Sequence, residues 1–138
     1  MKIAVLKESG AETRVAAIPE TVRKYAALGA SISVERGAGI SASISDADFE
    51  AAGASLGERA AVLADADIIL GIVGPAPASL DGAKQGAMLL GALDPARRAE
   101  DIAAYRGAGL DPLGIERLPR ITRAQSMDIL SSQSNLAG

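Results

Sequence analysis

Short aliphatic runs alternate with amphipathic segments along most of this chain. Ile3–Leu6, Ser31–Glu35 and Asp67–Val73 have the largely apolar character of strands that are buried on both faces of a parallel sheet. Met88–Leu90 and Leu113–Ile115 are shorter runs of the same kind. The pattern therefore predicts five strands, separated by segments long enough to hold helices.

Helical signals occupy most of the gaps between these runs. Pro19 suits the first position of a helix, and Gly29 stands where a helix commonly ends. One face of that helix is marked by Val22, Tyr25, Ala26 and Leu28. Three further helices are predicted over Asp46–Ala52, Gly57–Ala66 and Pro95–Arg106, the last with Asp94 as its N-cap.

Strands that alternate with helices predict an α/β fold in three layers. We expect a doubly wound, mainly parallel sheet with helices on both faces, in which Ile3–Leu6, Ser31–Glu35 and Asp67–Ile72 run parallel. The 138 residues suit one domain, and no internal repeat or linker divides them.

Composition narrows the possible chemistry. The net charge is −3 and no basic patch with interleaved aromatic residues occurs, which argues against a nucleic-acid partner. The chain has no Cys and no His, so we expect no thiol catalysis, no His-based triad and no transition-metal site. The longest apolar stretch, Ile68–Leu80, is interrupted by Pro75 and Pro77 and is shorter than the about 20 residues that span a bilayer. We therefore expect a cytoplasmic protein without direct membrane insertion.

A glycine-rich turn at Gly37–Ala42 matches G-x-G-x-x-A after a predicted strand. A dinucleotide fingerprint needs this turn to open a helix, with an acidic residue about 20 positions further on. Here Ile44, Ser45 and Asp46 precede any helical pattern, and position 57 is a glycine. We interpret the turn as structural and predict that it binds no nucleotide phosphate, so the domain lacks a dinucleotide fingerprint of its own.

Charged residues follow the first predicted strand, at Lys7, Glu8, Glu12 and Arg14. Loops at the carboxyl ends of parallel strands line the ligand crevice of open sheets. The loop is therefore a candidate site, with a solvated charged loop as the alternative. Asp65 and Asp67, at a helix–strand junction, are interpreted as caps and solvated charges.

The closing stretch gathers further polar groups. If Ser126 caps the last helix, Asp128 falls in its first turn, and an Arg120–Asp128 pair would fix the loop and leave Gln125 free to project. In a rival register, Thr122 is the cap and Gln125 completes a capping box. The residues alone leave both registers open.

Two long motifs carry a family resemblance over the whole chain. The segment KESGAETRVAAIPETVRKYAALGASISVERGAGISASISDADFEAAGA resembles the N-terminal signature of the alanine dehydrogenase and pyridine nucleotide transhydrogenase family, and PRITRAQSMDILSSQSNLAG resembles its transhydrogenase branch. The resemblance implies the NAD(H)-binding component of an enzyme that moves hydride directly between NAD(H) and NADP(H) and couples this to proton translocation. It implies partner components that bind NADP and span the membrane, a homodimer when full length, and a place beside the inner membrane held through those partners.

The same resemblance assigns roles in the closing stretch. Arg120, Gln125 and Asp128 match the family's catalytic loop, and Ser131 follows one turn later. By this resemblance Arg120 and Asp128 hold the carboxamide–ribose end of NAD, Ser131 bonds the carboxamide, and Gln125 reaches toward the partner's nucleotide. Catalysis would then rest on positioning, because hydride passes between two cofactors.

The alanine dehydrogenase branch is the enzyme alternative. By resemblance that branch grips a keto acid with an Arg, a Lys and a His. Arg14 matches the Arg, but ILGIVGPAP holds no Lys near Val73 and MLLGALDP holds no His. The sequence therefore disfavours amino-acid chemistry.

In the family, the nucleotide lies mainly in a second, Rossmann domain. We expect residues 1–138 to be the first domain, either as a fragment of a longer chain or as a stand-alone domain, and the abrupt SNLAG ending favours a fragment. A catalytically inactive domain that serves only for association is the non-enzyme alternative. We expect the chain to bind NADH no tighter than roughly millimolar, because a few hydrogen bonds do not offset the entropy of binding.

Overall fold

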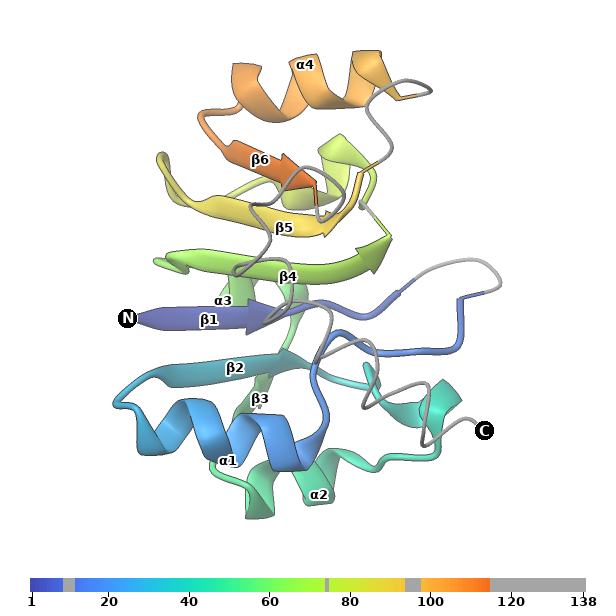
Figure 1. The fold of residues 1–138 in the computed structure, drawn as a ribbon, viewed down its shortest axis with the longest axis vertical. Coiled ribbons are helices and arrows are strands. Elements are labelled where there is room, and N and C mark those ends of the chain that lie inside the picture. Colours follow the sequence, from blue (N-terminus) through green and yellow to red (C-terminus); the bar gives the residue numbers. More distant parts are fainter. Residues whose placement is uncertain (9–11, 74, 94–97, 115–138) are drawn as a thin grey trace.

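The computed structural model describes residues 1–8, 12–73, 75–93 and 98–114. Within these ranges six strands form one sheet in the order β3-β2-β1-β4-β5-β6, and every pairing is parallel (Figure 1). The strands are β1 (Lys2–Val5), β2 (Ser31–Glu35), β3 (Ser55–Gly57), β4 (Ile68–Val73), β5 (Met88–Ala92) and β6 (Asp111–Gly114). The helices are α1 (Pro19–Ala27), α2 (Asp46–Ala51), α3 (Arg59–Leu63) and α4 (Ala99–Gly107), with 3₁₀ turns η1 (Ile40–Ala42) and η2 (Pro77–Leu80).

The strand order reverses at β1. The chain runs outward from β1 through β2 to β3, returns to place β4 on the other side of β1, and continues to β6. Ile3 lies opposite Ile32 of β2 and opposite Ile68 of β4. The predicted doubly wound sheet, with its first, second and fourth strands parallel, is confirmed. In such a sheet the reversal point, here between β1 and β4, is where a ligand crevice opens.

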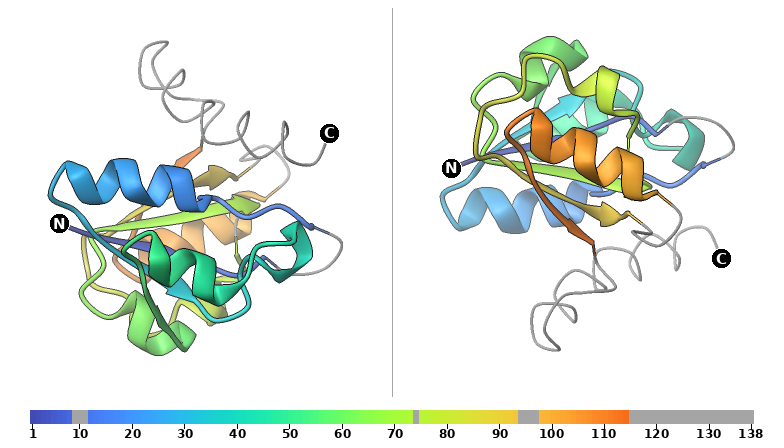
Figure 2. Two further views of the ribbon diagram at one scale, coloured as in Figure 1. Left: turned by 90° about the horizontal axis from the view of Figure 1, so that it is seen from below. Right: turned by 90° about the horizontal axis from the view of Figure 1, so that it is seen from above.

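Two apolar cores lie on opposite faces of the sheet. On one face α1 and α2 bring Val22 and the fully buried ring of Phe49 against strand residues such as Val34. On the other face Leu63 of α3 and Tyr105 of α4 pack in the core that also holds Ile69. Figure 2 shows α1 and α3 on opposite sides of the strands. Each face thus contains one buried aromatic ring among aliphatic side chains.

Several predicted boundaries need correction. The predicted helix Gly57–Ala66 is wrong at its start, because Gly57 pairs with Glu35 as the last residue of β3 and the helix begins at Arg59. The helix predicted over Pro95–Arg106 is α4, which begins at Ala99; positions 94–97 lie outside the described residues. The last strand starts two residues before the predicted Leu113, at Asp111. The loop predicted through Pro77 gives way to η2 at that residue.

The first helix begins at Pro19 as predicted, and Gly29 follows its end with a φ of +93°, which glycine adopts at little cost. Leu28 was assigned to the apolar face, yet it is 84% exposed. It caps the helix just beyond the last turn, so its side chain leaves the packed face. Among the described residues, no helix is long and apolar enough to cross a membrane.

Candidate functional site at the carboxyl edge of the sheet

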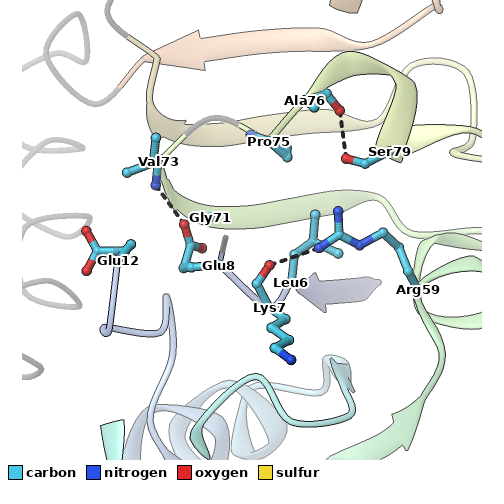
Figure 3. Close-up of a pocket in the computed structure, with 10 residues that line it drawn as sticks. All are labelled: Leu6, Lys7, Glu8, Glu12, Arg59, Gly71, Val73, Pro75, Ala76 and Ser79. Carbon is cyan, nitrogen blue, oxygen red and sulfur yellow. Dashed lines mark hydrogen bonds between the residues drawn. The ribbon is translucent and has the colours of Figure 1, made fainter. Parts of the chain in front are cut away.

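A cleft of about 510 Å³ opens at the carboxyl ends of β1 and β4, where the strand order reverses. Its walls come from the loop after β1, the end of β4 with the segment that follows it, and the first residue of α3 (Figure 3). The lining residues are Leu6, Lys7, Glu8, Glu12, Arg59, Gly71, Val73, Pro75, Ala76 and Ser79. The volume falls within the range of small-molecule and cofactor sites.

Glu8 joins the two strands that flank the reversal. Its carboxylate accepts hydrogen bonds from the backbone amides of Ile72, at 2.9 Å, and Val73, at 3.0 Å. β1 pairs with β4 only as far as Leu70, so the carboxylate occupies the place that a further strand residue would take. Burial raises the pKa of Glu8 above its ordinary value, and the two amides only partly oppose that effect.

A second carboxylate holds the opposite wall. Arg59, at the start of α3, donates from Nη2 to Glu35 at 2.8 Å and to the carbonyl oxygen of Lys7 at 2.9 Å. Its Nε also contacts both oxygens of Glu35. The amide of Lys7 donates to the same carboxylate at 2.8 Å. The pair is largely buried, with side chains 27% and 16% exposed, and it ties together the ends of β1 and β2 and the start of α3.

Glu12 lies in the cleft wall as half of an ion pair. Arg14 donates from Nε at 2.9 Å and from Nη2 at 3.1 Å, and its backbone amide donates to the same carboxylate. These bonds lower the pKa of Glu12, with the Arg14 side chain as the main cause. The guanidinium that resembles a keto-acid ligand is therefore committed to a neighbouring side chain.

The glycine turn lies beyond the end of β2 and has a structural explanation. Gly37 has a φ of +78°, and its amide donates to the Asp46 carboxylate at 2.9 Å. At Gly39, an added Cβ would lie 2.7 Å from the Phe49 ring. The turn leads into η1, which has three residues, and α2 begins only at Asp46. An anionic side chain thus stands where a phosphate would need the Gly37 amide, which supports the prediction that no phosphate binds here.

The sequence located some of the residues of this site. Lys7, Glu8 and Glu12 line the cleft and Arg14 pairs within it, as the carboxyl-edge argument predicted. Arg59 was missed, because nothing in a predicted helix indicates a bond to a glutamate 24 positions earlier. The other predicted site residues, Arg120, Gln125, Asp128 and Ser131, lie outside the described residues, so their roles stay predictions.

A parallel α/β sheet with a cleft at its reversal point defines the class: a ligand-binding domain of the doubly wound kind. The family model for the N-terminal domain of alanine dehydrogenase/PNT matches residues 4–137. The chain belongs to this family.

Three relatives show how the likeness is distributed. An NAD(P) transhydrogenase subunit alpha of Rhodospirillum rubrum is 43% identical over all of this chain, which covers 38% of that protein. The crystal structure of transhydrogenase from Sinorhizobium meliloti superposes with a TM-score of 0.85 at 43% identity, over 99% of this chain and 41% of that one. Alanine dehydrogenase of Mycobacterium tuberculosis (strain H37Rv) is 32% identical over 92% of this chain and 34% of its own length. The chain therefore spans about two fifths or less of the relatives it matches.

Proposed function

We propose that this chain is the first domain of the alpha subunit of an NAD(P) transhydrogenase. In this proposal hydride passes directly between NAD(H) and NADP(H), and the transfer is coupled to proton translocation. The observation that carries it is the likeness to transhydrogenase subunits, at 43% identity over the whole chain against 32% for an alanine dehydrogenase. NAD(H) would be bound mainly by a second domain, and NADP(H) and the membrane-spanning segments would belong to partner components, with this domain on the cytoplasmic side of the membrane.

The composition of the cleft supports the transhydrogenase branch over the alanine dehydrogenase branch. Val73 and Gly71 line the cleft at the end of β4, where the sequence has no Lys. Arg14 is held by Glu12, and β5 carries no His. A keto acid would therefore find no free cation at these positions. Hydride transfer between two nicotinamide rings requires no such cation, because the protein has only to position the rings.

Within this proposal the residues outside the described ranges complete the site. Arg120 and Asp128 would hold the carboxamide–ribose end of NAD(H), Ser131 would bond its carboxamide, and Gln125 would reach toward the NADP(H) of the partner. The 138-residue chain alone would transfer no hydride, since most of the nucleotide contacts would come from the second domain.

A hybrid enzyme tests the proposal. Residues 1–138 would replace the matching segment of the Rhodospirillum rubrum subunit, and reduction of an NADP⁺ analogue by NADH would be measured with the partner components present. We expect activity in the hybrid, a loss of about tenfold or more with Gln125→Ala, and none with the 138-residue chain alone. Glu100→Gln on α4 serves as a matched surface control. A hybrid that binds NADH and its partners but transfers no hydride, or that oxidises alanine instead, would contradict the proposal.

A further inference from the structure

We infer that Glu8 makes the cleft a subsite for a flat cationic ring, and that it favours the oxidised nicotinamide of NAD⁺ over the reduced ring of NADH. The identity of the ring rests on the proposed function. Its charge is argued from the cleft alone, because Glu8 is the group in the cleft whose charge the described chain leaves unbalanced.

The position of Glu8 leaves acceptor capacity for a ligand. The amide of Ile72 donates to Oε2 and the amide of Val73 donates to Oε1, so each oxygen receives one hydrogen bond. A carboxylate has about four lone-pair sites, and these two bonds use half of them. The amides also fix the orientation of the carboxylate at the wall of the cleft (Figure 3). A bound cation would meet a pre-positioned charge and would not have to order a mobile side chain.

The other charged groups that line the cleft are committed elsewhere. Glu12 is paired with Arg14, and Arg59 is paired with Glu35. The ammonium of Lys7 points away from Glu8 toward the glycine turn, where an added Cβ on Gly37 would lie 3.7 Å from Nζ (Figure 3). Within the described stretches of the chain, no ion pair involves Glu8. The pKa of Glu8 is accordingly raised by burial and by the nearby charge of Glu12.

The remaining walls suit a flat ring. Leu6, Val73, Pro75 and Ala76 supply apolar surface, and Ser79 turns its hydroxyl toward the carbonyl oxygen of Ala76. Apolar walls with one fixed charge are typical of sites that orient a small ring. The same charge repels a carboxylate, so the cleft selects against keto acids. At about 4 Å, one unit charge changes affinity by roughly fivefold in water and far more when partly buried, so about tenfold is expected in this open cleft.

Two small probes of the same shape isolate the effect of charge. Binding of 1-methylnicotinamide, a cation, and of nicotinamide, which is neutral, would be measured on the isotope-labelled 138-residue chain by NMR titration. We expect the cation to bind about tenfold more tightly to the wild type. Glu8→Gln should abolish this preference, since the amide keeps an acceptor oxygen but no charge. Glu50→Gln, which removes an exposed charge on α2, should leave it unchanged.

The pH dependence provides a second readout that needs no variant. The preference should disappear as the pH falls through the raised pKa of Glu8, above the ordinary glutamate range. Equal affinity for the two probes, a preference that survives Glu8→Gln, or no saturable binding of either probe would overturn the inference. The hybrid enzyme can transfer hydride in each of these cases, so failure here is distinguishable from failure of the proposed function.

Discussion

The two edges of the sheet each carry a carboxylate that bridges strands, and the two carboxylates differ in what balances their charge. At the amino edge, Asp67 accepts from the backbone amide of Lys2 at 2.9 Å and from Nζ of Lys84 at 2.7 Å. At the carboxyl edge, Glu8 accepts only from two backbone amides. One carboxylate has a cation supplied by the chain, and the other has none among the described residues.

The pKa values move in opposite directions for this reason. The Lys84 ammonium lowers the pKa of Asp67, whereas burial raises the pKa of Glu8. A carboxylate that is paired and solvated holds the fold together at little cost. A carboxylate that is half-buried and unpaired costs stability, and groups of this kind concentrate at functional sites. The comparison assigns structural support to the amino edge and ligand binding to the carboxyl edge.

The largest expected effect comes from the wall of the cleft. Glu35→Ala removes the acceptor shared by Arg59 and the Lys7 amide in a largely buried network. Its cost should lie between those of exposed and fully buried pairs, at about 2 kcal/mol in the free energy of unfolding by urea. Arg36→Ala breaks the exposed Arg36–Glu58 pair and should change stability by less than about 0.5 kcal/mol. Equal costs for both variants would contradict the account of this wall.

Replacement of Glu8 should separate its hydrogen bonds from its charge. Glu8→Ala leaves the amides of Ile72 and Val73 without their acceptor and should destabilise the fold by about 1–2 kcal/mol. Glu8→Gln keeps an acceptor and removes a desolvated charge, so at neutral pH it should be close to neutral. Urea unfolding of both variants checks this. A Glu8→Gln variant as unstable as Glu8→Ala would show that the charge itself stabilises the fold.

The pH dependence of stability should differ in sign at the two edges. Between the ordinary value of 4.5 and its raised pKa, Glu8 holds more protons in the folded state, so its contribution to stability falls as the pH rises. Asp67 has a folded pKa below its ordinary 3.8, so its contribution is lost as the pH falls through the range below that value. Urea midpoints at several pH values for Glu8→Gln and Asp67→Asn, each subtracted from the wild type, should show opposite slopes. Slopes of the same sign would remove the contrast.

The smallest effect should come from the amino edge at neutral pH. Asp67→Asn weakens an exposed pair that water already screens, so the urea midpoint should shift down by less than it does for Glu8→Ala. Lys84→Met, which removes the other partner, should give a shift of similar size. A shift at Asp67 that exceeds the one at Glu8 would mean that the amino edge contributes more to stability than the pairing suggests.

The sequence predicted the sheet because its main strands are apolar runs that any parallel sheet must bury. It predicted the loop after β1 as a site because the carboxyl edge of such a sheet is where ligands bind. It missed β3, since Ser55–Gly57 is too short to show a period and exists through its pairing with β2. The Arg59–Glu35 bond and the Glu8 contacts were beyond reach because they join residues 24 and more positions apart. The roles of Arg120, Gln125, Asp128 and Ser131 stay predictions.

The most direct test of the carboxyl edge as the functional one is a titration of the isotope-labelled chain with NAD⁺ at about millimolar concentrations, followed by amide chemical shifts. We predict that the largest changes occur at Gly71, Val73 and their neighbours around the cleft, and that Lys2, Asp67 and Lys84 stay unchanged. Changes centred on the amino edge, or on the Gly37 turn with no change at the cleft, would contradict the account.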